Sequence, residues 1–354
     1  MAPGLVCGEM AQGKKRLWSL SVANTPAAFL YFQSMFNSRF LQLLSEGLFF
    51  SMTQFVFAAP KTDTIPGLVV MDSAIHFLVL GDWGRMGSVP QQKVADVMAS
   101  AGRQLGISFI ISTGDNFYPS GVSDVKDSQW IYSFEKVYDA PSLQRRWLAV
   151  LGNHDYMTNP QAQVDYTFQS KHWFMPRRYY DTSMAIGKDS ILLVFLDTEP
   201  IEIQLRGIPA DSIKYLPGYV DQQLAWLKKV LSSSTARWKI VVGHHPLHTG
   251  GSRRHNRRVK KLRNLLQPVL SDNKVNFYLS GHEHHLEFLK PKGPTPYYII
   301  SGAGSETGHV GWLKRYRRFA ARKRGFVSIS IFSKGWLIQF ISDKEKVIYK
   351  YSLK

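Results

Sequence analysis

Three short apolar stretches in this chain each end in a glycine that polar side chains follow. The stretches and the residues after them are 76–80 with Gly81-Asp82, 107–112 with Gly114-Asp115, and 147–151 with Gly152-Asn153. Short apolar runs bounded by glycine are typical of buried parallel strands. Ligands bind in the loops at the carboxyl ends of such strands. We therefore expect these polar residues to meet in one crevice at the edge of a sheet.

The rest of the chain alternates between helix and strand patterns. Helices are predicted over 90–98, 123–139, 220–231 and 258–270, further strands over 191–196, 238–242, 275–279 and 297–300, and closing antiparallel strands over 326–331, 336–341 and 347–351. Residues 199–219 are rich in proline and glycine and are predicted to form a long loop. The repeated strand-helix-strand order predicts an α/β fold built from βαβ units.

The first 59 residues follow none of these patterns. Arg39, an apolar region over about 40–59 and the residues 56–58 are typical of a secretory signal peptide that starts at Met35. A poorly inserted membrane anchor and a disordered leader are the alternatives, because Glu46 interrupts the apolar region. The sequence predicts a leader over 1–59 and a single catalytic domain over 60–354. The signal predicts a secreted, periplasmic, vacuolar or lysosomal protein without membrane attachment once the signal is removed.

Charge and cysteine content limit the partners and the ligands. The formal net charge is +18, which favours anionic partners, although a solvated basic surface without a dedicated partner explains it equally well. The chain has one cysteine, Cys7, so it forms no intrachain disulfide and no cysteine-rich metal site. Any bound metal is therefore held by His, Asp, Asn, Glu or Tyr, which suit iron, manganese or zinc.

Two later predicted strands also end in ligand-type residues. Residues 238–242 precede Gly243-His244, and residues 275–279 lead into Gly281-His282-Glu283-His284. Side chains two apart in an extended segment lie on one side, so His282 and His284 can face the same ion. Two metal ions that share one carboxylate form a clamp for attack at phosphorus, and Asp115 is suited to be shared. The chain has neither a serine or cysteine nucleophile motif nor a phosphate-binding loop, which favours hydrolysis by metal-bound water.

In this order, the five motifs resemble those of the metallophosphoesterase superfamily, and specifically purple acid phosphatases of the small, tartrate-resistant type. The resemblance covers about residues 75 to 354. Tyr118, three residues after Asp115, is its most diagnostic residue, because other branches of the superfamily usually lack it. The resemblance implies a sandwich of two mixed β-sheets flanked by helices. It also implies an acid phosphatase, a phosphoric monoester hydrolase that uses metal-bound hydroxide as its nucleophile.

The resemblance further implies a role for each motif residue. A ferric ion would be held by Asp82, Asp115, Tyr118 and His284, and a second metal (iron, zinc or manganese) by Asp115, Asn153, His244 and His282. His154 would act near the leaving group as proton donor or phosphate contact, oriented by Asp155. Residues 199–219 resemble a loop that restrains activity in animal relatives.

Several assignments stay open at this point. A second catalytic histidine of the family has no clear match, and His248 and His255 are the candidates. His245 and His285 directly follow proposed ligands and are expected to point elsewhere. The alternative functions are a superfamily phosphodiesterase or nucleotide hydrolase, and a basic module without enzymatic activity. The expected substrates are phosphomonoesters, with phosphoproteins and nucleotides as candidates, and no dedicated nucleic-acid binding is expected. The arginine and lysine clusters after residue 252 either border the crevice or are solvated surface.

Overall fold

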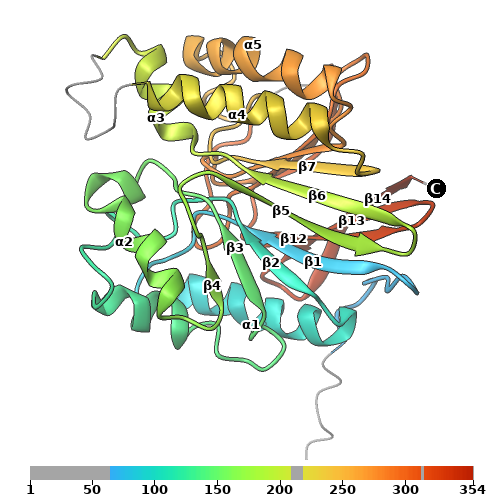
Figure 1. Cartoon of the computed structure of the whole chain (residues 1–354). Coiled ribbons are helices and arrows are strands. Elements are labelled where there is room, and N and C mark those ends of the chain that lie inside the picture. Colours follow the sequence, from blue (N-terminus) through green and yellow to red (C-terminus); the bar gives the residue numbers. More distant parts are fainter. Residues whose placement is uncertain (1–63, 209–217, 312–314, 354) are drawn as a thin grey trace, which may run out of the picture. The chain divides into compact units, whose positions relative to one another are not determined.

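The computed structural model describes residues 64–208, 218–311 and 315–353. Residues Thr62–Lys354 form one compact unit built on two seven-stranded sheets. Figure 1 shows the sheets stacked face to face, with α1 and α2 outside one sheet and α3, α4 and α5 outside the other. The α/β sandwich of two mixed sheets flanked by helices is therefore confirmed. The predicted leader lies outside the described residues, and the domain boundary stays a prediction.

The first sheet contains the three apolar stretches that end in Gly81, Gly114 and Gly152. Its order is β14-β13-β12-β1-β2-β3-β4, in which β1 to β4 are parallel and β12 to β14 pair antiparallel. The strands are β1 Ile75–Leu80, β2 Phe109–Ser112, β3 Arg146–Ala149, β4 Trp173–Phe174, β12 Gly325–Phe332, β13 Gly335–Ser342 and β14 Lys346–Leu353. Leu80 pairs with Ser112, and Ser112 pairs with Ala149, so β1, β2 and β3 end level with one another.

The second sheet has the order β11-β9-β10-β8-β7-β6-β5. Its strands are β5 Tyr180–Ile186, β6 Asp189–Phe195, β7 Trp238–Val242, β8 Phe277–Ser280, β9 Leu286–Leu289, β10 Tyr297–Ser301 and β11 Arg317–Ala321. β6, β7, β8 and β10 run parallel, and β5, β9 and β11 are antiparallel to their neighbours. The carboxyl ends of β7 and β8 therefore open at one edge, as those of β1, β2 and β3 do in the first sheet.

The helices bury one apolar side each. They are α1 Val89–Leu105, α2 Pro160–Asp165, α3 Thr198–Leu205, α4 Tyr219–Ser233 and α5 Arg257–Asp272. One apolar cluster fills the space between the sheets and under α1. A second cluster lies between the second sheet and its helices, with Leu227 of α4 and Leu262 of α5 fully buried. Within the described residues, no helix is both long enough and apolar enough to span a membrane.

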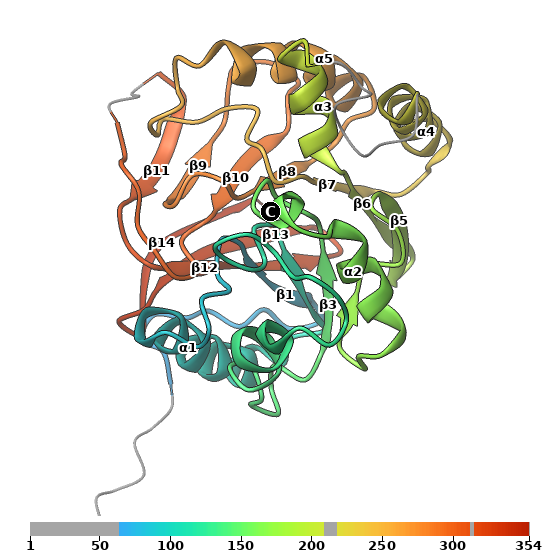
Figure 2. The ribbon, with the colours of Figure 1, turned by 90° about the vertical axis from the view of Figure 1, so that its left-hand side faces the viewer.

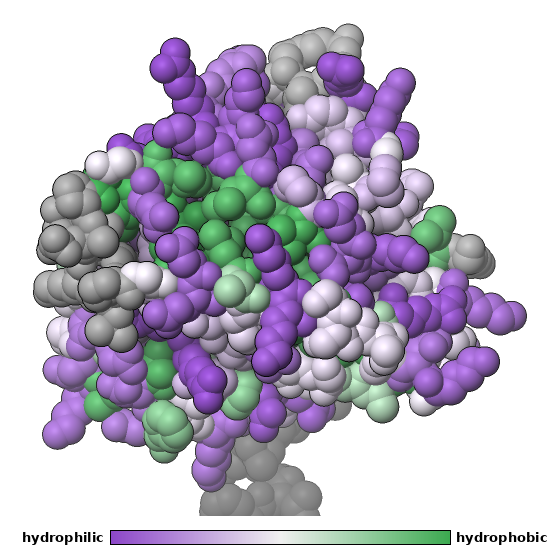
Figure 3. Space-filling model, turned by 45° about the horizontal axis from the view of Figure 1, so that its top comes forward, coloured by the Kyte–Doolittle hydropathy of each residue, from purple (hydrophilic) through white to green (hydrophobic). Residues whose placement is uncertain are grey.

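The helix-covered side of the second sheet also exposes apolar side chains. Figure 3 shows an apolar patch on this side, surrounded by hydrophilic residues. Leu224 and Val230 of α4 and Leu265 and Val269 of α5 are only partly buried against the second cluster.

Two predicted elements differ from the structure. The helix predicted over 123–139 is limited to a π-helical turn, Trp130–Glu135, because the Asp124 and Asp127 side chains accept hydrogen bonds from nearby backbone N–H groups and favour turns. The loop predicted over 199–219 begins as α3, since Ile201 and Leu205 join the apolar cluster below α5. The strands β4, β5, β9 and β11 and the helix α2 were not predicted.

Candidate metal centre

The polar residues at five strand ends meet where the two sheets adjoin. Asp82, Asp115 and Asn153 follow β1, β2 and β3 of the first sheet, while His244 and His282 follow β7 and β8 of the second. Hydrogen bonds join the two groups of loops. The Asp82 carboxylate accepts from the His282 backbone N–H (3.0 Å), and the Thr113 carbonyl accepts from His244 Nδ1 (2.9 Å). The crevice expected from the sequence is therefore present.

The first set of donors surrounds the Tyr118 hydroxyl. Its oxygen lies 3.1 Å from Asp82 Oδ1, 2.9 Å from Asp115 Oδ2 and 3.1 Å from His284 Nε2. His284 Nε2 also lies 3.3 Å from Asp82 Oδ1. Two ligand atoms that bind one ion at right angles, each at about 2.1 Å, are about 3.0 Å apart. The spacing of these four side chains fits a common ion.

The second set of donors surrounds His244 Nε2. This nitrogen lies 3.4 Å from Asp115 Oδ2, 3.3 Å from Asn153 Oδ1 and 3.1 Å from His282 Nδ1. Because His244 Nδ1 donates to a carbonyl oxygen, Nε2 is the ring nitrogen that faces the cluster and that would bind an ion. Asp115 Oδ2 belongs to both sets, as a shared carboxylate would.

The backbone at these strand ends is strained in a way that serves the cluster. Asp82, Asp115 and His282 have positive φ angles of 58°, 50° and 68°, which non-glycine residues adopt rarely and at a cost of about 1–3 kcal/mol each. Gly152 is required because a Cβ there would lie 2.2 Å from Asp115 Oδ1. Gly281 is required because a Cβ there would lie 2.4 Å from Asp82 Oδ2. Each glycine makes room for a carboxylate from another strand end.

The electrostatics of the cluster are those of a cation site. Burial by itself would raise the pKa of Asp115, but the nearby imidazoles of His244 and His154 hold it well below its usual value. Burial would lower the pKa of His244, and the Asp115 carboxylate reverses this and raises it to about 9. Burial, and then the charges of Asp82 and Asp115, raise the pKa of the Tyr118 phenol well above its usual value. A bound cation would relieve this crowding of buried oxygens and favour the phenolate.

Comparison with known proteins places this geometry in a family. The family model described as calcineurin-like phosphoesterase matches residues 75–286. Purple acid phosphatase 7 of Arabidopsis thaliana is 36% identical over 73% of this chain and 80% of its own length. Tartrate-resistant acid phosphatase type 5 of Sus scrofa is 31% identical over 79% of this chain and 86% of its own. The chain belongs to the purple acid phosphatase family. A solved structure of GAP50, the anchor in the inner membrane complex of Plasmodium, is 25% identical, with a TM-score of 0.68 over 79% of this chain and 89% of that one.

Purple acid phosphatases are binuclear metal enzymes, and the donors present here fit that centre. Seven side chains supply oxygen and nitrogen atoms in two sets that share Asp115. Asp82, Asp115 and His244, which supply part of both sets, are all buried and have ligand atoms within 4.8 Å of one another.

The structure places His154 beside the cluster but gives Asp155 another role than expected. His154 Nε2 lies 4.0 Å from Asp115 Oδ2, and the His154 side chain is 30% exposed. Its Nδ1 contacts the Pro119 carbonyl oxygen at 2.5 Å, so Pro119 and not Asp155 orients the ring. The fully buried Asp155 carboxylate instead accepts hydrogen bonds from backbone N–H groups of the loops after β2 and β3.

The other histidines that the sequence singled out are not members of the two donor sets. His248 is buried against Gln267 and Tyr316, and His255 is exposed and contacts Arg254, so neither candidate for a second catalytic histidine lies in the metal crevice. His285 pairs with Glu287 (3.1 Å), away from the cluster as expected.

His245 lies beside the proposed ligand His282 and not at the surface, while its ring nitrogens face Thr198 and Glu199. His245 is buried, its ring centre lies 4.5 Å from that of His282, and its Nδ1 contacts Thr198 Oγ1 at 2.9 Å. His245 and Thr198 meet because α3, which the sequence did not predict, begins at Thr198 next to the loop after β7.

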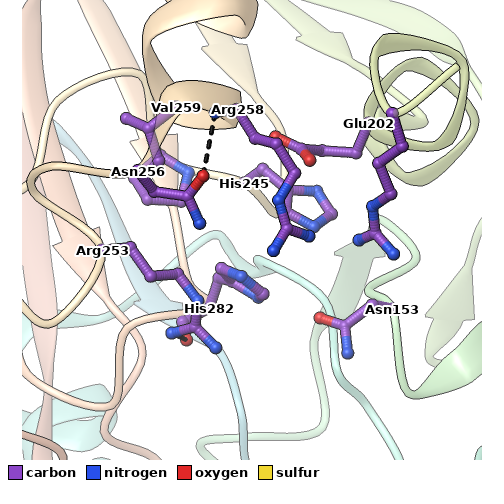
Figure 4. A pocket seen from close by; sticks show the side chains of 10 residues that line it. Asn153, Glu202, His245, Arg253, Asn256, Arg258, Val259 and His282 are labelled. Atoms are coloured by element: carbon purple, nitrogen blue, oxygen red, sulfur yellow. Dashed lines mark hydrogen bonds between the residues drawn. The ribbon is translucent and has the colours of Figure 1, made fainter.

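A cavity of about 180 Å³ adjoins the second set of donors (Figure 4). Asn153, His245 and His282 line it on the metal side, and Arg206, Arg253 and Arg258 also line it, with Arg253 next to His282. Arg253 and Arg258 belong to the basic clusters that were expected either to border the crevice or to be solvated surface, and both line this cavity. Arg206 belongs to the predicted loop 199–219, and its basic side chain was not singled out from the sequence.

Proposed function

We propose that this chain is an acid phosphatase that hydrolyses phosphomonoesters at a binuclear metal centre. The observation that carries the proposal is the convergence of seven donor side chains in two sets around Asp115. Relatives named purple acid phosphatase and tartrate-resistant acid phosphatase align over most of this chain and support it.

We infer that the first set, Asp82, Asp115, Tyr118 and His284, holds Fe(III). Two carboxylates and a phenolate are hard, anionic donors that suit a trivalent ion. The second set has one shared carboxylate, an amide and two imidazoles, which suit Fe, Zn or Mn in the divalent state. When bound, the two ions supply Lewis acidity that neutralises the phosphoryl group and lowers the pKa of water.

The residues of the chain would position the substrate around these ions. Since the Pro119 carbonyl holds His154 Nδ1, Nε2 is left to face the crevice, where it can contact the phosphoryl group or pass a proton to the leaving oxygen. Arg85 lies over the Tyr118 ring, with its guanidinium carbon 3.8 Å from the ring centre, and it pairs with Glu306 (3.0 Å). Glu306 also lies 3.8 Å from His284 Nδ1, so Arg85 packs beside the first set with its charge balanced by Glu306.

A test combines metal analysis, a visible spectrum and phosphate release. Purified protein is expected to contain about two metal ions per chain, to absorb visible light, and to release phosphate from an aryl monophosphate faster at acid than at alkaline pH. Asp115→Asn is expected to abolish both metal binding and activity. Asp165→Asn is the matched control, because Asp165 is exposed and its carboxylate accepts a hydrogen bond from the exposed Gln161 side chain.

The same assay separates the other functions. Faster hydrolysis of an aryl phosphodiester by a colourless protein would replace the proposal with a superfamily phosphodiesterase. Polyanion binding without phosphate release after metal loading would replace it with a basic binding module.

We also infer that the protein is exported, which rests on the signal-like pattern over residues 35–59. Expression of the full chain in a eukaryotic host and sequencing of the mature N-terminus test this inference. A mature protein that still begins upstream of residue 35 would contradict it.

A further inference from the structure

The cavity beside the metal centre extends away from it in one direction. Asn153 and His282, both members of the second donor set, lie at its metal end. Its lining contains neither Asp82 nor Tyr118 nor His284 of the first set. The cavity therefore adjoins the second donor set of the proposed binuclear centre and not the first.

Three separate segments bring arginines to this cavity. Arg206 follows α3, Arg253 lies in the loop after β7, and Arg258 lies in the first turn of α5. Figure 4 shows Arg258 directed toward the space between His282 and Asn153. Asn256, the N-cap of α5, also lines the cavity, and its side chain accepts a hydrogen bond from the Arg258 backbone N–H (2.9 Å).

The arginines differ in how they are held. Arg253 donates to the His282 carbonyl (3.2 Å) and lies 3.6 Å from the Glu283 carboxylate, which fixes it at the metal end. Arg206 and Arg258 are exposed, and neither has a carboxylate within 4.0 Å among residues 64–208, 218–311 and 315–353. Their guanidinium donors are therefore available to a ligand.

The charge and the volume of the cavity indicate which kind of ligand it can bind. The three arginines face one carboxylate in the lining, that of the buried Glu202, which leaves a net positive charge. Guanidinium groups match the oxygens of phosphate in a bidentate manner. Pockets for drug-sized ligands have volumes of about 300–1,000 Å³. A cavity of about 180 Å³ is smaller than these pockets but has room for a phosphoryl group.

We propose that Arg206, Arg253 and Arg258 bind a second phosphoryl group of a small substrate whose first phosphoryl group is hydrolysed at the metal centre. This proposal rests on the proposed function and narrows its substrate class to soluble molecules that carry two phosphoryl groups. The bond broken is the ester bond of the first group, and the second group stays attached to the leaving alcohol.

The kinetic test uses α,ω-alkanediol bisphosphates with two to six carbons and the matching monophosphates. For at least one chain length, kcat/KM of the wild-type protein is expected to be at least about tenfold higher for the bisphosphate. Arg206→Gln and Arg258→Gln are each expected to lower this ratio about tenfold, by raising KM for the bisphosphate. A tenfold loss is the lower end of the effect of losing a charge-assisted hydrogen bond, and we expect the lower end because both side chains are exposed. Arg257→Gln is the control: Arg257 precedes Arg258, is exposed and does not line the cavity.

A binding test does not depend on turnover. Calorimetry with alkane-α,ω-bisphosphonates of the same lengths is expected to show tighter binding than with the monophosphonates, and both substitutions are expected to remove the difference. The proposal is overturned if no bisphosphonate binds more tightly, if either substitution weakens mono- and bisphosphonates equally, or if an ω-carboxyalkyl phosphonate binds as well as the bisphosphonate. A preferred bisphosphonate together with a protein that hydrolyses no monophosphate would instead overturn the proposed phosphatase activity.

Discussion

Asp155 offers the sharpest test of how the metal crevice is held together. Its buried carboxylate accepts hydrogen bonds from the backbone N–H groups of Gly152 (2.8 Å), Asn116 (3.0 Å) and Phe117 (3.2 Å) and from Gln163 Nε2 (2.8 Å). The carboxylate thereby ties the loop after β2, which carries Asp115, to the loop after β3, which carries Asn153. The structure thus gives Asp155 the role of positioning these two loops, in place of the role of orienting His154 that the resemblance implied.

Asp155→Asn keeps the shape of the side chain but replaces one acceptor oxygen with an NH₂ group. In either orientation, the NH₂ group faces N–H donors that it cannot satisfy. Leaving a buried donor unpaired costs about 1–3 kcal/mol, and losing a bond to a charged acceptor costs a similar amount. We expect a total of about 3–5 kcal/mol, which is about 6–10 °C in Tm at about 2 °C per kcal/mol for a domain of this size.

The assay is thermal unfolding of metal-free protein, read beside the pH profile of aryl phosphate hydrolysis by the metal-loaded protein. Asp165→Asn is the control and is expected to change Tm by about 1 °C at most, as surface substitutions usually do. A Tm equal to that of the wild type, together with a displaced pH optimum, would refute the positioning role. It would show instead that Asp155 acts on the proton held by His154.

Three further outcomes follow from the same structure. Tyr118→Phe is expected to remove the visible absorbance of the iron-loaded protein, since the phenolate is the donor of the charge transfer, and a variant that keeps its colour would contradict the ligand set. Removal of metal with a chelator is expected to lower Tm by several degrees in the wild type and by nothing in Asp115→Asn, because only the native cluster gains free energy from the ions; equal shifts would place the ions elsewhere. Burial raises the pKa of Asp197 to about 6, although the hydroxyls of Tyr156 and Tyr219 oppose this. The pKa of Asp197 in the folded protein thus lies above 3.8, its value in the unfolded chain. The protonated carboxyl therefore contributes stability at low pH, and this contribution is lost as the pH rises through 6. Asp197→Asn should therefore gain about 2 kcal/mol relative to the wild type between pH 4 and pH 8 in denaturant unfolding, and a constant difference would refute this.

The local pattern of the sequence was enough to find most of the proposed ligands. Asp82, Asp115, Asn153, His244 and His282 each follow an apolar run and a glycine, and this pattern depends only on residues next to each other in the chain. The carboxyl ends of parallel strands meet at one edge, so the pattern also predicted that these residues converge. The α/β class followed from the same alternation of strands and helices.

The tertiary structure decided which groups orient and surround those ligands. The ring of His154 is held by Pro119 and not by its neighbour Asp155, because the two loops meet only after β2 and β3 pair. The cavity exists because α3 and α5 pack side by side and bring Arg206 and Arg258 together. These contacts join residues that are far apart in the chain. Their geometry depends on how side chains fill the space between elements, and no short-range pattern in the sequence encodes it.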